Sequence, residues 1–285
     1  MKHTLTFLTA LLLAPLAALC AAQEASVTGI PSLDEMAGDW IPMNDVANPP
    51  AVHNFNQMLV VDRDLTSFFC NPGGLYPWRH GYPIVKLAVD GKEYPATETR
   101  SFAYRALRRN PQCGGIAVET DTRMVNEKRG VLCRITAVNT TSKPVKTTLT
   151  LRVPGTLLAD GVGVDNRSQR TNVVSVARPS RMPDLVTTET NGVCWTWNVS
   201  LPTGSNVTLG FVAGDDEASQ AAQTAARVAA WAARFDAVMD ECKQVWEQRW
   251  DDAFTPGNTH FSGNLPVLKT SDAALAAIGG LDLAS

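Results

Sequence analysis

The residues best suited to bind a ligand lie in a loop rich in glycine, proline and aromatic side chains. Segment 75–82 reads LYPWRHGY and combines three large rings with an arginine and a histidine. Sugars present apolar C–H faces that stack on aromatic rings, and their hydroxyl groups pair with such polar side chains. The alternative is that the rings are buried as packing residues, because large aromatics contribute so much apolar area. The residues predicted to contact carbohydrate are Tyr76, Trp78, Arg79, His80 and Tyr82.

A second pair of aromatic side chains alternates along a predicted strand. In the run VCWTWNV, Trp195 and Trp197 point to the same face. Two tryptophans on one face could form a stacking platform for a sugar. Burial in the core of a sheet structure is the favoured interpretation, because tryptophan is highly buried on average.

The remaining residues capable of chemistry form no recognisable catalytic or metal-binding motif. Asp62-Arg63-Asp64 could bind a cation or an arginine, although solvated loop charge is the more ordinary explanation. The histidines His53, His80 and His260 lack metal-ligand spacing. The chain also lacks a phosphate-binding glycine loop, a nucleophile elbow and a basic-aromatic patch. We therefore predict no metal and no cofactor.

Composition limits the possible partners and sizes. The chain has 285 residues, a net charge of −3, 45% hydrophobic residues and 19% charged residues. This length accommodates one large β domain or two ordinary ones. The small negative charge provides no global attraction to nucleic acid or anionic lipid. We expect no nucleic-acid partner.

The N-terminus predicts export. Residues 1–3 (MKH) precede the apolar run LTFLTALLLAPLAALCAA, which a proline interrupts and which is short for a membrane span. Small residues up to Ala22 predict a signal peptide of residues 1–22 with cleavage before Gln23. An uncleaved anchor is one alternative. A lipoprotein acylated at Cys20 is another, disfavoured by the bulky Leu19. We expect an exported protein with no membrane contact after cleavage.

Five cysteines remain after the predicted cleavage, and an odd number cannot all pair within one chain. One or two disulfides are compatible with an exported protein. We favour the alternative that Cys133 and Cys194 fill space as buried strand residues, because free cysteine is readily buried.

Alternating hydrophobicity predicts an antiparallel β domain upstream of residue 215. In VLCRITAVN (131–139), one face carries Val131, Cys133, Ile135 and Ala137, and the next run (147–153) alternates similarly, which suggests that the two form an antiparallel pair. Residues 84–97 predict a hairpin around Asp90-Gly91. Further strands are predicted at 57–61, 101–107, 115–122, 173–177, 185–190, 193–199 and 207–213. This pattern favours a large antiparallel sandwich.

One long helix is predicted over residues 215–254. Asp215, Asp216 and Glu217 suit its positive end, and Pro256-Gly257 stops it. A narrow apolar stripe recurs at gaps of three and four, formed by Val228, Trp231, Phe235, Val238, Cys242 and Val245. A coiled-coil dimer would explain the stripe, but it covers only about three heptads. Docking onto the domains of the same chain is therefore favoured.

The phrases RVAAWAARFDAVMDECKQVWEQRWDDAF and FSGNLPVLKTSDAAL resemble a junction found in bacterial glycoside hydrolases of the six-hairpin class. This class is similar to trehalases, processing α-glucosidases and debranching glucosidases. The upstream phrase RMVNEKRGVLCRITAVNTTSKPVKTTLTLRV is also similar to strands of its N-terminal β-supersandwich. The resemblance extends over residues 39–275. It implies a supersandwich joined by a linker helix to an (α/α)6 barrel.

The resemblance also sets the expected domain boundaries. They are a signal peptide (1–22), a β-supersandwich (23–214), a linker helix (215–254) and the truncated start of an α/α barrel (255–285), with a short C-terminal helical stub. The catalytic carboxylates of the family belong to the barrel, so the resemblance assigns no catalytic residue here. Residues expected to pack against the missing barrel are Trp231, Phe235, Trp246, Trp250 and Phe261. All of these except Trp250 are expected to leave exposed apolar surface.

These features predict the non-catalytic N-terminal domain of an exported glycoside hydrolase, inactive alone, with an oligosaccharide or polysaccharide ligand. A free-standing carbohydrate-binding protein is an alternative from the binding class. A helix-mediated structural oligomer is the third.

Overall fold

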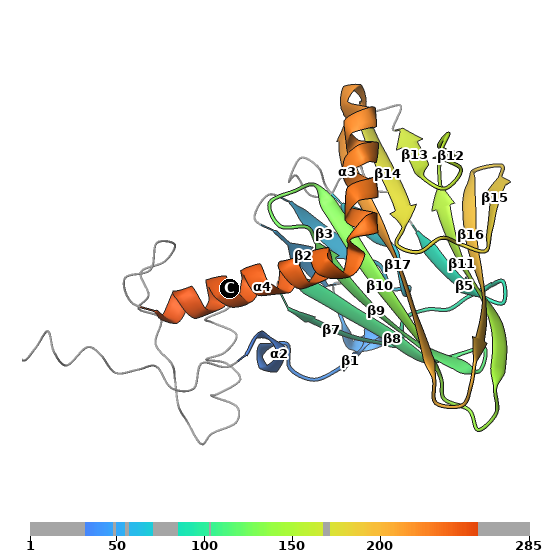
Figure 1. Ribbon diagram of the computed structural model, residues 1–285. Coiled ribbons are helices and arrows are strands. Elements are labelled where there is room, and N and C mark those ends of the chain that lie inside the picture. The colour runs from blue at the N-terminus through green and yellow to red at the C-terminus, as the bar shows by residue number, and fades with distance from the viewer. Residues whose placement is uncertain are drawn as a thin grey trace, which may run out of the picture. The chain divides into compact units, whose positions relative to one another are not determined.

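The computed structural model describes residues 32–47, 50–54, 57–70, 85–102, 104–167 and 172–255, without the Cys70 side chain. The predicted signal peptide, the five predicted sugar-contact residues in segment 75–82, Phe261 and the predicted helical stub lie outside the described residues. Those predictions are therefore not tested. The described part is mainly antiparallel β structure followed by helices, as the sequence predicted (Figure 1).

The helices and strands of the described chain have the following bounds. The helices are α2 (Leu33–Met36), η1 (Met43–Asp45), η2 (Ala218–Gln220), α3 (Ala221–Ala233) and α4 (Phe235–Phe254). The first strands are β1 (Ile41–Pro42), β2 (Ala51–His53), β3 (Met58–Val61), β4 (Phe68–Cys70), β5 (Lys86–Val89), β6 (Lys92–Glu93), β7 (Glu98–Phe102), β8 (Arg105–Cys113) and β9 (Ile116–Met124). The remaining strands are β10 (Gly130–Asn139), β11 (Val145–Pro154), β12 (Thr156–Leu157), β13 (Val164–Arg167), β14 (Val173–Pro179), β15 (Leu185–Glu189), β16 (Gly192–Leu201) and β17 (Asn206–Glu217).

The described strands form three antiparallel sheets. The nine-stranded sheet has the order β1-β7-β8-β9-β10-β17-β14-β13-β12, and the five-stranded sheet has the order β15-β16-β11-β5-β6. A small third sheet has the order β2-β3-β4. The inward faces of all three contribute to one core, as expected for a sandwich.

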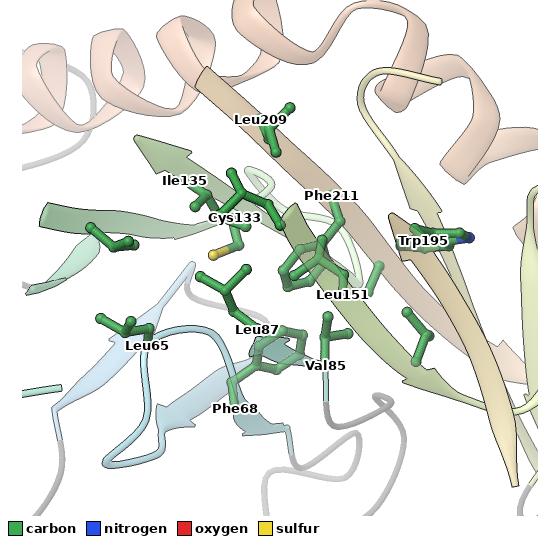
Figure 2. Close-up of a cluster of buried hydrophobic side chains, with 14 of the residues drawn as sticks. Leu65, Phe68, Val85, Leu87, Cys133, Ile135, Leu151, Trp195, Leu209 and Phe211 are labelled. Carbon is green, nitrogen blue, oxygen red and sulfur yellow. The ribbon is translucent and has the colours of Figure 1, made fainter. Parts of the chain in front are cut away.

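The core consists of the alternate residues of strands from all three sheets. Cys133 and Ile135 of β10 and Phe211 of β17 lie opposite Leu151 of β11 and Trp195 of β16 (Figure 2). Phe68 of β4 stacks on Phe211 with ring centroids 6.1 Å apart. Burial of each large apolar side chain contributes about 1.5–3 kcal/mol, so this continuous core is the main source of stability.

The predicted hairpin at Asp90-Gly91 is confirmed. β5 and β6 pair across it, and the two turn residues have φ values of 49° and 77°. Positive φ at both central residues is the type I′ geometry whose twist matches the flanking strands. Asp90 also accepts a hydrogen bond from the Thr148 backbone N–H at 2.8 Å, which ties the turn to β11.

The prediction of one strand over residues 101–107 is wrong. β7 ends at Phe102 and β8 begins at Arg105, so the chain reverses in the middle of the predicted strand. No glycine, proline or asparagine marks this turn. The buried ring of Tyr104, only 1% exposed, stabilises it by packing rather than by turn chemistry.

The predicted pairing of segments 131–139 and 147–153 is also wrong, although both are strands. β10 pairs with β9 and β17 in one sheet, whereas β11 pairs with β16 and β5 in another. The connection therefore crosses between sheets. Asn139, which is buried, stabilises this crossing by donating from Nδ2 to the Lys143 and Leu201 carbonyls at 2.8 and 3.0 Å.

The helical region begins later than predicted and contains a break. Residues 215–217 extend β17, because they pair with residues 173–175 of β14. Helix α3 starts at Ala221 after a 3-10 turn, and Arg234, with φ −118° and ψ 28°, separates α3 from α4. Tertiary strand pairing at residue 215 thus overrides the local preference of acidic residues for a helix start.

Docking of the helical stripe onto its own chain is confirmed. Val228, Phe235, Val238 and Cys242 are buried against Leu132, Val174, Val176 and Val212 on the outer face of the nine-stranded sheet (Figure 1). The expected exposure of Phe235 and Trp246 is wrong, because they are only 7% and 9% exposed. Trp231 is partly buried in the same cluster. Phe235 and Trp246 are therefore covered within this chain, whereas a barrel domain was expected to cover them.

Three glycines allow this close approach of the helices to the sheet. A Cβ on Gly130 would lie 2.5 Å from the Trp231 ring, and one on Gly210 would lie 2.5 Å from the Phe235 ring. A Cβ on Gly214 would lie 2.9 Å from Val228. Real Cβ atoms do not approach other atoms this closely. Because these three positions carry no side chain, the helices can pack directly against the sheet. We call Gly130, Gly210 and Gly214 the glycine seat.

Residues 32–248 form one compact unit, and residues 249–255 belong to a second. Within the second unit, the Trp250 and Phe254 rings meet edge to face with centroids 5.0 Å apart. No helix in the described part of the chain is long and apolar enough to cross a membrane.

Four cysteines of the described part are buried free thiols, which confirms the space-filling interpretation of Cys133 and Cys194. Desolvation raises the pKa of Cys113, Cys133 and Cys242 to about 11. Their thiolate fraction at pH 8 is then about one in a thousand, and thiolate is the reactive form.

We expect N-ethylmaleimide to leave these three cysteines unmodified in the native protein and to label them in urea, as measured by peptide mass spectrometry. Rapid native labelling of Cys133 at pH 8 would contradict the buried placement.

Candidate functional site

The second predicted sugar platform is part of the core. Trp195 and Trp197 are 0% and 2% exposed, and their indole N–H groups donate to the Val162 and Met182 carbonyls at 3.0 Å each. A buried ring cannot stack on a sugar, so the packing interpretation is confirmed.

The Asp62-Arg63-Asp64 segment has an arginine partner from the core. Arg108 is fully buried, and its Nη1 donates to the backbone carbonyls of Asp62, Asp64 and Ser67 at 3.2, 2.8 and 2.8 Å. Its Nη2 donates to Thr122 Oγ1 at 3.1 Å. Desolvation lowers the pKa of Arg108. The segment is thus held from within by a structural guanidinium.

Charged side chains of both signs line the outer face of β7, β8, β9 and β10, next to the helices. Strand pairing sets Glu98 opposite Arg109 and Arg109 opposite Glu119. It also sets Arg105 opposite Arg123 and Asp121 opposite Arg134. Residues that pair directly project to the same side of a sheet. We define the charged face as Glu98, Arg100, Arg105, Arg109, Glu119, Asp121, Arg123 and Arg134.

The segment around α2 borders the charged face on one side. Arg105 pairs with Asp34 at 2.8 Å, and Arg100 donates to the carbonyls of Gly38, at 2.6 Å, and Asp34. The Trp40 ring lies over the Arg109 guanidinium at 4.1 Å, a cation–π contact. A serine cap and capping box at Ser32 fix the start of α2. A partly exposed aromatic ring thus stands next to arginines and carboxylates.

Helix α4 borders the charged face on the other side. Arg123 forms a two-pronged contact with Asp121 at 2.6–3.1 Å, and its Nη1 donates to the Met239 carbonyl at 2.7 Å. Arg134 pairs with Asp236 at 2.8 Å. Arg123 and Asp121 are largely buried, with side chains 6% and 14% exposed. At this end of the charged face, Arg123 and Arg134 therefore use their hydrogen bonds to hold α4 on the sheet.

An aromatic cluster lies where α4 passes the β7–β8 turn. The Trp246 ring meets His53 edge to face at 5.0 Å and Tyr104 at 6.2 Å. Desolvation lowers the pKa of His53, which favours neutral imidazole. Arg105 and Arg123 lie 5.7 and 5.4 Å from the Tyr104 ring centroid. The cluster is closely packed, so its main effect is to fix α4.

Glu119 differs from the other carboxylates of the charged face. Its side chain is exposed and hydrogen-bonds to no described residue, whereas Glu98 accepts from Arg109 Nε at 2.6 Å. Neighbouring side chains still remove part of its hydration. This desolvation raises the pKa of Glu119, and the charge of Arg109 partly offsets the effect. Glu119 can therefore accept a hydrogen bond or exchange a proton with a ligand.

Three hollows of the described part involve residues of the five-stranded sheet. One, of about 340 Å³, is lined by Asp90, Lys146, Thr148 and Asn198 among others, and a second, of about 270 Å³, includes Lys86, Arg152 and Glu189. A third, of about 320 Å³, includes only the edge of buried Trp197 as an aromatic. Ligand pockets are usually lined by apolar and aromatic groups. These three hollows have no exposed aromatic ring among their lining residues, so they offer little for a sugar ring to stack on.

Within the described ranges, no three His, Cys, Asp or Glu residues are grouped to hold a metal ion. The charged face is not apparent from the sequence, because its members are spread over four strands. The sequence does contain one indication of a charged sheet face, namely the regular placement of charge in ETRSF, RALRR and ETDTR. Period-two charge in successive strands marks one sheet face, but only the register shows which charges meet.

Comparison with known proteins provides a fold but no family. No family model matches the chain, and no curated protein matches it. Among solved structures, a protein named as a candidate kojibiose phosphorylase from the human microbiome aligns with a TM-score of 0.50 and 9% identity. The alignment covers 77% of this chain and 36% of that one. This chain therefore spans about a third of the relative's length.

Two other matches have TM-scores below 0.5 and add nothing to the fold argument. One is a heparan sulfate lyase from Pedobacter heparinus, with a TM-score of 0.38 and 9% identity over 56% of this chain and 33% of that one. The other is a candidate aldose 1-epimerase from Escherichia coli K12, with a TM-score of 0.37 and 7% identity over 59% of this chain and 98% of that one. The described chain thus has a β-sandwich fold, and it resembles one part of the protein named as a candidate kojibiose phosphorylase.

Proposed function

We propose that this sandwich is the non-catalytic domain of an exported glycoside hydrolase, which supports a catalytic domain instead of cleaving sugars itself. The observation that carries the proposal is the fold similarity to one part of the phosphorylase, at a TM-score of 0.50 over 77% of this chain. Export rests on the predicted signal peptide. The sugar-binding loop 75–82 remains a proposal on the same basis.

The carboxylates of the described part support a non-catalytic role. Glycoside hydrolysis needs two carboxyl groups on opposite sides of the scissile bond at a defined separation. Glu119 and Asp121 share one face of β9 and are one pair to consider. Asp121 is largely buried and held by Arg123 in three hydrogen bonds, so it is not available to a substrate.

The test is turnover by the 285-residue chain on a panel of α- and β-linked glucose disaccharides, with and without inorganic phosphate. We expect no product above the buffer rate, because the two carboxyl groups that hydrolysis needs are proposed to belong to another domain. The matched variants are Glu119→Gln and Asp121→Asn. Turnover that either variant abolishes would overturn the proposal and assign catalysis to β9.

The helix-mediated oligomer is the less favoured alternative. Val228, Phe235, Val238 and Cys242, which a coiled coil would use, are buried against the chain's own sheet. Light scattering across a hundredfold concentration range would separate the helix-mediated oligomer from a domain that docks its own helices. A dimer that uses these residues would have to release the helices from the sheet.

A further inference from the structure

We propose that one end of the charged face is a binding site for a neutral oligosaccharide, formed by Trp40, Arg109 and Glu119 with Glu98 and Arg100 beside them. The sequence alone does not bring these residues together. The inference rests on the proposed function in one respect, the choice of glycans as the ligand class. The open hydrogen-bonding groups and the neighbouring ring indicate the site itself.

Arg109 and Glu119 are cross-strand partners that do not form an ion pair. They lie directly opposite each other on β8 and β9, where Cβ atoms are about 4.5–5.5 Å apart. Arg109 uses Nε to reach Glu98 on the other side, at 2.6 Å, and the rest of its guanidinium makes no hydrogen bond to a described residue. A carboxylate acceptor and guanidinium donors are thus adjacent and open. A sugar hydroxyl, which donates and accepts at once, can bridge them.

Trp40 supplies the apolar element that a pyranose requires. Its ring is partly exposed and held over the Arg109 guanidinium at 4.1 Å, so its orientation is fixed before a ligand arrives. Arg109 is itself 37% exposed and Glu98 32% exposed at the side chain. A ring, a donor and an acceptor therefore meet at one solvent-accessible place. That combination suits the C–H face and the hydroxyl edge of a sugar.

Charge balance favours a neutral ligand over an acidic one. Arg100 and Arg109 are matched by Glu98 and Glu119 at this end of the face. An anionic sugar would gain from the arginines but would meet two carboxylates, one of them unpaired. A neutral sugar meets no such opposition. The site should therefore bind neutral oligosaccharides with little dependence on salt.

The experiment is isothermal titration of the 285-residue chain with maltotetraose and cellotetraose. We expect saturable binding of at least one of them. Glu119→Gln should weaken it about tenfold, because it removes a charge-assisted hydrogen bond. Trp40→Ala should weaken it at least as much, and Trp40→Phe, which keeps a ring, should retain most of the affinity. Circular dichroism would verify that each variant is folded.

The matched control is Glu93→Gln. Glu93 is an exposed glutamate with ion pairs to Lys86 and Arg152 at 3.4 and 3.3 Å, but it lies on the five-stranded sheet. It should leave the affinity unchanged. No binding at millimolar sugar, binding unaffected by both Trp40→Ala and Glu119→Gln, or binding only of an acidic oligosaccharide that salt abolishes would each overturn the site. Turnover, scored separately, tests the non-catalytic role and does not depend on this result.

Discussion

Replacing Arg108 by methionine should lower the free energy of unfolding by about 3–5 kcal/mol. Methionine fills a similar volume, but it leaves the carbonyls of Asp62, Asp64 and Ser67 without their buried donor. For a domain of this size, the loss corresponds to a melting temperature roughly 6–20 °C lower. Urea unfolding followed by circular dichroism measures the change.

Arg109 is the matched control, since it is the next residue and points to the opposite face. Arg109→Met removes an ion pair and a cation–π contact at a partly exposed position, at a cost of about 1–2 kcal/mol in total. We therefore predict that Arg108→Met is much less stable than Arg109→Met. Equal losses for the two variants would contradict the placement of Arg108 in the core.

Gly130→Ala should destabilise the protein by about 1–3 kcal/mol. The added methyl group would lie 2.5 Å from the Trp231 ring and 2.9 Å from Val125, so α3 must move away from β10. Chemical unfolding measures the loss. The same substitution is expected to leave the core between the sheets unchanged, because Gly130 meets the helix on the outer face.

A double-mutant cycle identifies the cause. In a Trp231→Leu background the contacting ring atoms are absent, so Gly130→Ala should cost less than half of its value in the parent protein. If the cost is the same in both backgrounds, the ring does not determine it. In that case the glycine seat is not the reason for the close approach of α3.

The sandwich could be predicted from the sequence because the inward residues alternate strictly. Val131, Cys133 and Ile135 are all fully buried, as the pattern of β10 indicated. The hairpin at Asp90-Gly91 was likewise marked by its turn residues. Both are local signals, so neither depends on knowing which strands meet.

Long-range features could not be predicted in this way. An alternating strand looks the same whichever sheet it joins, so the crossing from β10 to β11 left no trace in the pattern. The break at Arg234 has no proline or glycine. It accompanies the placement of Phe235 over Gly210, which lies 25 residues earlier in the chain. Tertiary packing therefore fixes both features.

The candidate site shows the same division. Aromatic density in the sequence favours segment 75–82 as a sugar-binding loop. This segment lies outside the described residues, so its sugar contacts stay a prediction. The site at Trp40, Arg109 and Glu119 combines residues 79 positions apart, and strand register brings Arg109 and Glu119 together. The sequence indicates the residue types, but it does not indicate that Arg109 and Glu119 lie side by side.

The most direct test of the central claim uses the native protein. An antibody raised against this chain would isolate it from its source, and glycan cleavage and molecular mass would be measured in the same fractions. We predict that cleavage elutes with a species heavier than the 30.7 kDa of this chain, because another domain supplies the catalytic carboxylates. Cleavage by a species of 30.7 kDa or less, or no cleavage in any fraction that contains the chain, would contradict the claim.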